Sequence, residues 1–373
     1  MRTFRTPYRY DVVGSFLRPA FLKEARLMHE SGELDGDGLK AVEDRAITEL
    51  VAKEKAAGLH VITDGEFRRS AWHLDFMWAF DGVGHKKTEK GLPFHGEAAM
   101  IDDTYLTGRL ALSSEHPFAS HFRFLSQFEE EGVTAKLTIP APAQFAEQFL
   151  MPSFWPNSSK YYKDFDDLCA DIVSCYIKAI GDFYSAGVRN LQLDDCSWGM
   201  LVDPRAEAIF ATDSAGLEHI KGLFLEVNNA VLEALPDDLT VNTHVCRGNF
   251  HSTYASEGGY EGVASYLLEK EKVHAFFLEF DDWRSGGFGP LSHVPEDKLV
   301  VLGLVTTKRA ELEDVSLIKE RIREASRYVP LERLCLSPQC GFASCEIGNK
   351  LTEEEEWGKV RLVRRIAEEV WYL

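Results

Sequence analysis

The chain has 373 residues, 45% of them hydrophobic, and 41 Lys and Arg stand against 60 Asp and Glu for a formal net charge of −19. An apolar fraction near one half can fill a large core, so the composition excludes a disordered chain. The negative charge repels phosphate backbones and anionic lipid surfaces, and we find neither a basic cluster nor an apolar run of about 20 residues, so we expect no nucleic-acid and no membrane partner.

The N-terminus and the cysteines both indicate a reducing compartment. Residues 1–16 contain basic side chains but neither an apolar h-region nor a small-residue cleavage site, so they do not resemble a secretory signal. Seven cysteines are an odd number scattered over a long chain, which is unlike a disulfide framework. We therefore expect a cytoplasmic protein with reduced thiols.

Short apolar runs alternate with longer segments of helical period, and neither a repeat nor a linker divides the chain. Such alternation is typical of parallel βα units, and eight units predict one domain over residues 1–373, an α/β fold of the (β/α)₈ TIM barrel type. The predicted strands are residues 11–13, 60–63, 134–139, 190–193, 239–245, 273–280, 298–305 and 333–336.

The helical period predicts the elements that cover these strands. In the last of them, Thr352 and four glutamates precede several basic residues, an order that suits the helix macrodipole. Residues 81–114 fit neither pattern, and we expect an inserted segment or hairpin near one mouth of the barrel. The predicted helices are residues 39–58, 165–187, 214–234, 311–328 and 352–371.

One strand end combines a histidine with a cysteine. In a barrel of this kind the site lies at the C-terminal ends of the strands. Period-2 alternation over residues 239–246 places Asn242, His244 and Cys246 on one face. An imidazole beside a thiolate suits a tetrahedral zinc ion. For this pair alone, a hydrogen-bonded core histidine beside an inert core cysteine is the alternative.

Two further strand ends carry groups of the ligand type. Glu279 ends an apolar run, and burying an unpaired carboxylate there costs several kcal/mol, so it needs a cation, a metal or solvent. Cys340 lies just beyond the last strand, before a glycine, where a thiol is well placed to be a ligand. A closed barrel would bring these groups to one rim and form a Cys₂HisGlu zinc site. Singly, a solvated strand end and a packing cysteine are the alternatives.

Carboxylates and a glycine turn follow three other strands. Val13-Gly14-Ser15 closes the first strand, Asp64-Gly-Glu66 the second and Asp194-Asp195 the fourth. Acidic groups at a rim can hold a substrate ammonium group, and the backbone N–H groups of Gly14 and Ser15 can hold a carboxylate. Capping of the following helix is the alternative for each aspartate.

Taken together, these segments occur in the order, and at roughly the spacing, found in the catalytic half of cobalamin-independent methionine synthase. The chain resembles a single-barrel relative of that enzyme over nearly its whole length. The segments that carry the resemblance are Val13-Gly-Ser-Phe16, Asp64-Gly-Glu-Phe67, Gln192-Leu-Asp-Asp195, Thr243-His-Val-Cys246, Glu279 and Ser337-Pro-Gln-Cys-Gly341.

The resemblance implies a zinc-containing (β/α)₈ barrel in which Zn²⁺ activates the thiol of homocysteine for methyl transfer, giving methionine. It also implies which residues bind each group. The zinc ligands would be His244, Cys246, Glu279 and Cys340, the homocysteine carboxylate would meet Val13, Gly14 and Ser15, and its ammonium group would meet Glu66 and Asp194.

Two departures from the family bear on the methyl donor and on catalysis. The full-length enzyme has a second barrel that helps to hold methylfolate, and 373 residues make only one, so 5-methyltetrahydrofolate is the expected donor but the donor stays open. Lys308 stands about where the family has a histidine thought to protonate the leaving group. Lys308 is therefore a candidate proton donor or binder of an acidic substrate, and a solvated loop lysine is the alternative.

Other functions remain to be distinguished from homocysteine methylation. One is a zinc-barrel transferase or lyase that acts on a different thiol, although Glu66 and Asp194 argue against a thiol without an amino group. Another is a barrel that binds homocysteine or zinc without turnover. A porphyrin decarboxylase fits poorly, because it would need arginine clusters for the substrate carboxylates.

Overall fold

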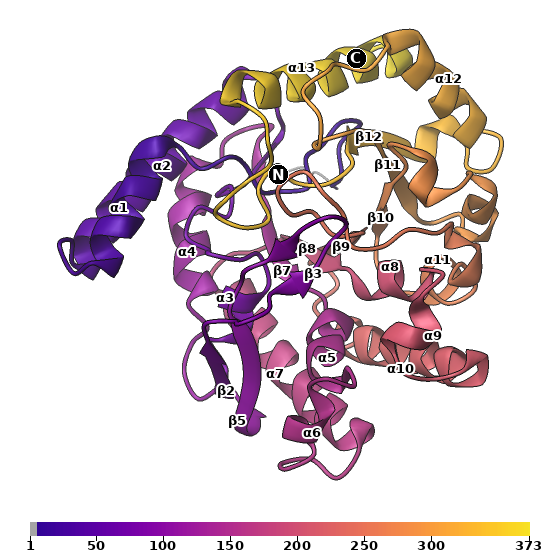
Figure 1. Ribbon diagram of the computed structural model, residues 1–373. Helices are drawn as coiled ribbons and strands as arrows, with labels where there is room; N and C mark the ends of the chain where they lie inside the picture. The colour runs from indigo at the N-terminus through magenta and orange to yellow at the C-terminus, as the bar shows by residue number, and fades with distance from the viewer. Residues whose placement is uncertain (1–5) are drawn as a thin grey trace.

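A computed structural model, described for residues 6–373, has a mixed α/β fold with helices arranged around a parallel sheet (Figure 1). Six parallel strands lie in the order β12-β11-β10-β9-β8-β7, and β1 and β6 form a further parallel pair. Residues 1–5, part of the stretch compared with a secretory signal, lie outside the described residues. The strands are β1 (Val61–Ile62), β6 (Thr134–Ala135), β7 (Leu137–Pro140), β8 (Asn190–Asp195), β9 (Thr240–Val245), β10 (Ala275–Glu279), β11 (Leu299–Val305) and β12 (Leu334–Pro338).

Seven of the eight predicted strands have counterparts in these elements, and the first does not. Residues 11–13 form no strand, although Tyr10 makes a single parallel bridge to Leu336 of β12. The side chain of Asp11 accepts a hydrogen bond from the backbone N–H of Val12 at 2.7 Å. This N–H group therefore cannot donate to a neighbouring strand. Aspartate side chains often compete with strand pairing in this way.

The third predicted strand is divided at Lys136 into β6 and β7. The backbone N–H of Lys136 donates to Ile62 O at 2.9 Å, so the division does not end the pairing with β1. At the N-terminal side, Phe16 N donates to Gly65 O at 3.2 Å. The segment before α1 therefore contacts both β12 and the turn after β1.

All five predicted helices are present, with ends that differ by a few residues. Asp35 caps α2 by accepting from Gly38 N, and Thr352 forms a capping box with Glu355 at the start of α13. The α-helices are α1 (Ala20–Glu30), α2 (Gly36–Ala56), α3 (Leu74–Met77), α4 (Phe118–Leu125), α5 (Pro142–Leu150), α6 (Trp155–Ser158), α7 (Phe165–Ser185), α8 (Ser197–Leu201), α9 (Ala206–Ile209), α10 (Ser214–Leu232), α11 (Leu267–Lys270), α12 (Val315–Ala325) and α13 (Glu353–Trp371). Short 3₁₀ helices are η1 (Ser126–Phe128), η2 (Tyr260–Gly262), η3 (Trp283–Ser285), η4 (Gly289–His293) and η5 (Leu331–Arg333).

The inserted segment predicted at residues 81–114 is an antiparallel hairpin with a smaller strand pair in its connection. β2 (Asp81–Lys86) pairs with β5 (Asp103–Ala111), and β3 (Leu92–Pro93) pairs with β4 (Ala98–Ala99). His95 N donates to Tyr254 O at 2.8 Å. The insertion therefore reaches the loop that follows β9, on the side where the parallel strands end.

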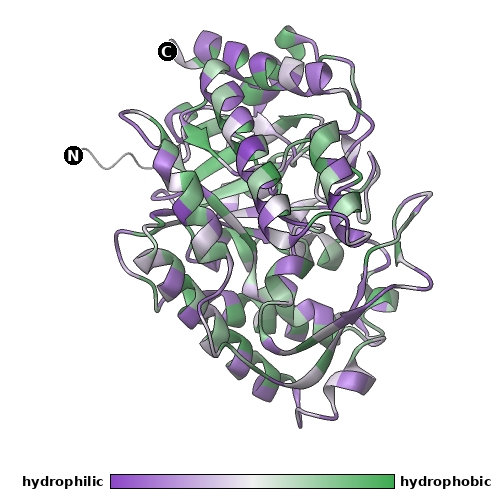
Figure 2. Ribbon diagram, turned by 90° about the vertical axis from the view of Figure 1, so that its left-hand side faces the viewer, coloured by the Kyte–Doolittle hydropathy of each residue, from purple (hydrophilic) through white to green (hydrophobic). Residues whose placement is uncertain are grey.

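The strands and the inward faces of the helices form the core, as the hydropathy colouring in Figure 2 shows. Val241 and Val245 of β9 are buried in the main hydrophobic cluster, whereas Asn242 and His244 belong to the alternate set of buried positions. This alternation is the one predicted for the strand. Within the described residues, no helix combines the length and apolar character needed to cross a membrane.

Candidate active site

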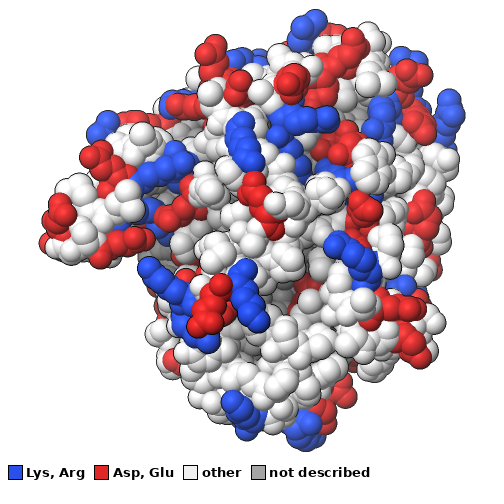
Figure 3. Space-filling model, viewed as in Figure 1, with Lys and Arg blue, Asp and Glu red and all other residues white. Residues whose placement is uncertain are grey.

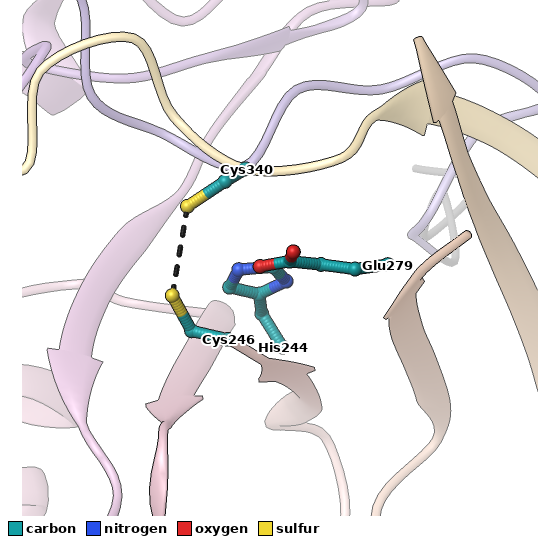
Figure 4. Close-up of side chains that lie close together, drawn as sticks. All are labelled: His244, Cys246, Glu279 and Cys340. Atoms are coloured by element: carbon teal, nitrogen blue, oxygen red, sulfur yellow. Dashed lines mark hydrogen bonds between the residues drawn. The ribbon is translucent and has the colours of Figure 1, made fainter. Parts of the chain in front are cut away.

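Four side chains of the ligand type meet at the C-terminal ends of the strands (Figure 4). His244 comes from β9, Cys246 follows it, Glu279 ends β10, and Cys340 lies in the loop after β12. All four are buried, and their ligand atoms lie within 4.8 Å of one another. Cys246 Sγ and Cys340 Sγ are 3.7 Å apart. The structure thus brings together the four residues that the sequence suggests as zinc ligands.

Several atoms of this cluster lack hydrogen-bond partners although they are buried. They are both ring nitrogens of His244 and Oε2 of Glu279, whereas Glu279 Oε1 accepts from Arg247 N at 3.0 Å. Buried polar atoms are nearly always hydrogen-bonded, so unpartnered atoms facing one another indicate room for a ligand. Two sulfurs, an imidazole nitrogen and a carboxylate oxygen are a donor set that zinc accepts, and the residues therefore fit the ion.

The two thiols are held in their neutral form by their surroundings. A hydrogen bond with Cys196, followed by burial, raises the pKa of Cys246 well above its ordinary value. A hydrogen bond with Cys246, followed by burial, does the same to the pKa of Cys340. A cation between the sulfurs would reverse this preference, because metal coordination requires thiolates.

A small cavity of about 20 Å³ adjoins the cluster and is lined by the residues predicted to bind the amino acid. Gly14, also predicted, lies in the chain between two of its lining residues. Glu279 and Lys308 do not line it. The lining residues are Val13, Ser15, Glu66, Trp72, Asp194, His244, Cys246, Cys340, Gly341 and Ser344.

Glu66 adopts a backbone conformation that side-chain-bearing residues seldom adopt. Its φ is +60°, and Arg18 holds its carbonyl oxygen with a hydrogen bond from Nη2 at 2.8 Å. Thr138 Oγ1 donates to Glu66 Oε1 at 2.8 Å, while Oε2 is buried without a partner. Strain of this kind persists where the surroundings determine the conformation, often at functional sites. The consequence here is a carboxylate directed at the small cavity.

Asp194 and Asp195 end β8, and their side chains have different partners. Gln192 Nε2 donates to Asp194 Oδ1 at 2.7 Å, and burial together with the charge of Glu66 raises the pKa of Asp194 well above its ordinary value. Asp195 instead accepts from Ser197 N at 2.9 Å, at the start of α8. Asp195 thus bonds to the first residue of α8, whose N-cap position is Cys196, and Asp194 lies beside Glu66 at the small cavity.

The Val13-Gly14-Ser15 turn is closely packed against neighbouring strands. A Cβ on Gly14 would lie 2.7 Å from Thr138 Cγ2, and a Cβ on Gly341 would lie 2.0 Å from Ser15 Oγ. Both glycines therefore permit a backbone approach that a larger residue would block. Gln192 Nε2 also donates to Val13 O at 2.8 Å, so one amide connects this turn with Asp194.

A second, much larger cavity of about 680 Å³ shares Trp72 and Cys246 with the small one. Its wall is mostly apolar and includes residues 92–95 of the insertion, residues of α5 and the loop after β9. On the face seen in Figure 3 the molecule is hollowed near its centre, with mostly uncharged surface below the hollow and charged side chains on its left. A substrate of considerable size can therefore reach Cys246 from this side.

Lys308 lies near the site, behind its wall. Its Nζ donates to Asn249 Oδ1 at 3.0 Å, and Asn249 Nδ2 donates to Gly341 O at 2.7 Å. Asn249 lines the large cavity, whereas Lys308 is not among the residues that line either cavity. Lys308 thus contacts the site through Asn249.

Several residues of the site were not found in the sequence. Cys196 directly follows a predicted strand end, so its position was a usable signal, whereas Trp72 and Asn249 lie in loops without a distinguishing pattern. Gln144 and Glu147 lie on α5 and line the large cavity. The sequence predicted no helix over these residues, so nothing in it indicated that they form a cavity wall.

The pattern of the family described as "Cobalamin-independent synthase, Catalytic domain" matches residues 156–368. The uncharacterized protein YxjH of Bacillus subtilis (strain 168) is 43% identical over 369 residues, which cover 98% of this chain and 96% of YxjH. A solved putative vitamin-B12 independent methionine synthase from Listeria monocytogenes is 34% identical with a TM-score of 0.77 and 99% of each chain covered. A B12-independent methionine synthase from Shewanella sp. W3-18-1, solved in complex with selenomethionine, has a TM-score of 0.72 at 17% identity, with 97% of each chain covered.

Proposed function

We propose, since the chain belongs to the cobalamin-independent methionine synthase family, that it transfers a methyl group to the thiol of homocysteine and forms methionine. One observation carries this proposal. The four-residue ligand cluster and the cavity containing Glu66 and Asp194 meet at Cys246, so a single small molecule can offer a thiol to one and an ammonium group to the other.

For the fold, we infer one closed (β/α)₈ barrel over residues 1–373. Closure would run through the N-terminal segment, which bridges to β12 at Tyr10 and meets the turn after β1 at Phe16. Thr63 Oγ1 also donates to Gly14 O at 2.7 Å. These contacts support neighbours on both sides of the segment, as closure requires.

For the metal, His244, Cys246, Glu279 and Cys340 would hold one Zn²⁺ ion. When bound, zinc supplies a Lewis acid that keeps the homocysteine sulfur in its nucleophilic thiolate form near neutral pH. The chain's own part is to fix these ligands on neighbouring strand ends and to exclude water from them by burial.

For homocysteine, Glu66 and Asp194 would bind the ammonium group and Val13, Gly14 and Ser15 the carboxylate. The raised pKa of Asp194 supports this assignment, because an ammonium group between the two acids would relieve their repulsion. Holding both ends of the amino acid orients its sulfur toward Cys246, and such orientation lowers the barrier of a two-substrate reaction.

For the donor, we propose that a 5-methyltetrahydrofolate occupies the large cavity, which reaches Cys246. Lys308 would assist transfer as a proton donor or through Asn249, which it contacts. The seven free cysteines support a reducing, cytoplasmic location.

The test is to measure zinc per chain and then assay methionine formation from homocysteine with several donors in parallel. These are 5-methyltetrahydrofolate as the mono- and polyglutamate, methylcobalamin and S-methylmethionine. We expect about one zinc per chain and methionine from the folate. Methionine formed from another donor would support methyl transfer to homocysteine and would replace the folate as the proposed donor.

Two other functions remain distinguishable in the same assay. A barrel without turnover would bind homocysteine and form no methionine with any donor. A transferase or lyase for a different thiol would bind thiols lacking an amino group as well as homocysteine, which the two acids in the small cavity disfavour.

A further inference from the structure

The wall of the large cavity contains a buried carboxyl group that neither the metal cluster nor the homocysteine site uses. Glu147 of α5 is 5% exposed and lines the cavity, and its Oε1 has no hydrogen-bond partner. Leaving a buried carboxyl oxygen without a partner is unfavourable, so a ligand that hydrogen-bonds to it gains affinity.

Gln144, one helical turn before Glu147, fixes the orientation of the carboxyl. Gln144 Nε2 donates to Glu147 Oε2 at 3.1 Å, and Gln144 Oε1 accepts from Cys196 N at 2.9 Å. Both functional groups of the amide are therefore occupied. They leave Glu147 with one bonded oxygen and one free oxygen at the cavity.

The carboxyl of Glu147 is mostly neutral, so it favours an uncharged ligand that both donates and accepts a hydrogen bond. Burial, together with the charge of Asp195, raises the pKa of Glu147 to about 8. Near pH 7 the group is mostly protonated, and a carboxylic acid offers one O–H donor beside an acceptor oxygen. Such a pair is complementary to a ligand edge that places an acceptor next to an N–H donor.

Aromatic rings around the same cavity suit a flat ligand. The rings of His95 and Tyr254 stack with centroids 4.9 Å apart, and those of Phe94 and Phe250 lie 5.4 Å apart. All four residues line the cavity, as does Trp72, which also borders the small cavity. Aromatic walls bind planar heterocycles by stacking and by apolar contact.

We infer that Glu147, positioned by Gln144, recognises the proposed donor by pairing with an N–H group and the adjacent carbonyl or ring-nitrogen acceptor on one edge of the donor's planar heterocycle. The inference rests on the proposed methyl transfer and deepens it. A reduced pteridine has such an edge. A sulfonium amino acid such as S-methylmethionine has no planar heterocycle to stack on the aromatic rings, and its N–H donors and acceptor oxygens belong to charged groups, which a neutral carboxyl pairs with less well.

The experiment measures donor binding separately from turnover. Zinc-loaded wild type, Glu147→Leu, Glu147→Gln and Gln144→Ala are titrated calorimetrically with 5-methyltetrahydrofolate, and each is titrated separately with homocysteine. We expect Glu147→Leu to raise the Kd of the folate at least tenfold. Glu147→Gln, which retains a donor and an acceptor, should recover most of the affinity, and Gln144→Ala should fall between them.

Two controls separate recognition from general damage. Glu226→Leu makes the same change on an exposed position of α10 and should leave the folate Kd unchanged. The Kd of homocysteine and the zinc content should be equal in wild type and Glu147→Leu, because neither the ligand cluster nor the small cavity includes Glu147.

The outcomes that overturn the inference differ from those that overturn methyl transfer. Equal folate Kd values for wild type and Glu147→Leu would overturn the role of Glu147 and leave methyl transfer intact. A wild type that binds no folate and methylates homocysteine from S-methylmethionine would also overturn it. Failure of the proposed function would instead appear as no methionine from any donor, while folate titrations still report on Glu147.

Discussion

Cys246 Sγ lies 3.7 Å from Cys340 Sγ, although the two cysteines are 94 positions apart in the chain. β9 and β12 bring them together through the intervening strands β10 and β11 of the same sheet. These two buried thiols form no disulfide, and with His244 and Glu279 beside them they lie in a geometry that a tetrahedral ion could bridge.

Removal of one of these sulfurs should release the metal. Cys340→Ala is expected to lower zinc from about one per chain to a small fraction, because three remaining ligands bind far more weakly than four. Zinc can be measured by mass spectrometry after dialysis against a weak chelator. Cys175→Ala removes a buried thiol of α7 outside both cavities and should retain full zinc. Equal zinc in both variants would contradict the ligand assignment.

Loss of charge at Asp194 should weaken the binding of homocysteine and leave the binding of the methyl donor unchanged. Asp194→Asn keeps the shape and removes a charge-assisted hydrogen bond of about 2 kcal/mol, so the KM of homocysteine should rise roughly 30-fold. The KM of the donor should not change. The control is a thiol carboxylate without an amino group, 4-mercaptobutyrate, whose inhibition constant should be unaffected. A parallel loss for both compounds would mean that Asp194 does not meet the ammonium group.

Substitution of Lys308 tests whether it takes part in chemistry. Lys308→Ala should lower kcat about tenfold at saturating substrates, with zinc content and the KM of homocysteine unchanged, because Lys308 lines neither cavity. Asn249→Ala removes the residue that Lys308 Nζ contacts at 3.0 Å. If Lys308 acts through Asn249, both variants should show the same kcat. Unchanged turnover of Lys308→Ala would exclude a chemical role.

His116 should make the fold sensitive to acid. Burial lowers its pKa to about 4, and its ring accepts a hydrogen bond from Phe118 N at 3.2 Å on Nδ1, which protonation would break. The unfolded chain has the ordinary pKa of about 6.5 and therefore binds more protons between pH 6.5 and 4. Stability from this group is present above that window and is lost as pH falls through it.

The expected loss from His116 between pH 7 and pH 5 is about 2 kcal/mol of unfolding free energy. Urea denaturation at the two pH values measures it. His116→Gln cannot titrate, so its stability should fall by about 2 kcal/mol less than that of wild type over the same interval. Burial also lowers the pKa of His73, which contributes equally to both proteins, and of His121, whose pKa the charge of His116 lowers further. Identical pH dependence in the two proteins would contradict the assignment.

Features that depend on short-range pattern were predictable from the sequence. Alternation along residues 239–246 was enough to place His244 and Cys246 on one face, and helical period located α2, α7, α10, α12 and α13. The prediction of the first strand was wrong for a local reason, because the side chain of Asp11 accepts a hydrogen bond from the next backbone N–H. Asp194 and Asp195 could not be separated in advance, because that requires knowing which face of β8 borders the cavity.

The large cavity was beyond sequence reasoning for a different reason. Its wall joins the insertion, α5 and the loop after β9, and their relative positions depend on tertiary contacts such as that between His95 and Tyr254. Glu147 had no signal, because a glutamate in an amphipathic helix is ordinarily solvated. Glu147 becomes a candidate binding residue only because it is buried, and its burial depends on the assembled fold.

The sharing of Trp72 and Cys246 by the two cavities has a stereochemical consequence. Reactants bound in the two cavities meet at one point, so a methyl group can pass directly from one to the other. Direct displacement inverts the carbon, whereas relay through a protein nucleophile would invert it twice. A methyl group made chiral with hydrogen isotopes would therefore arrive on sulfur with its handedness reversed.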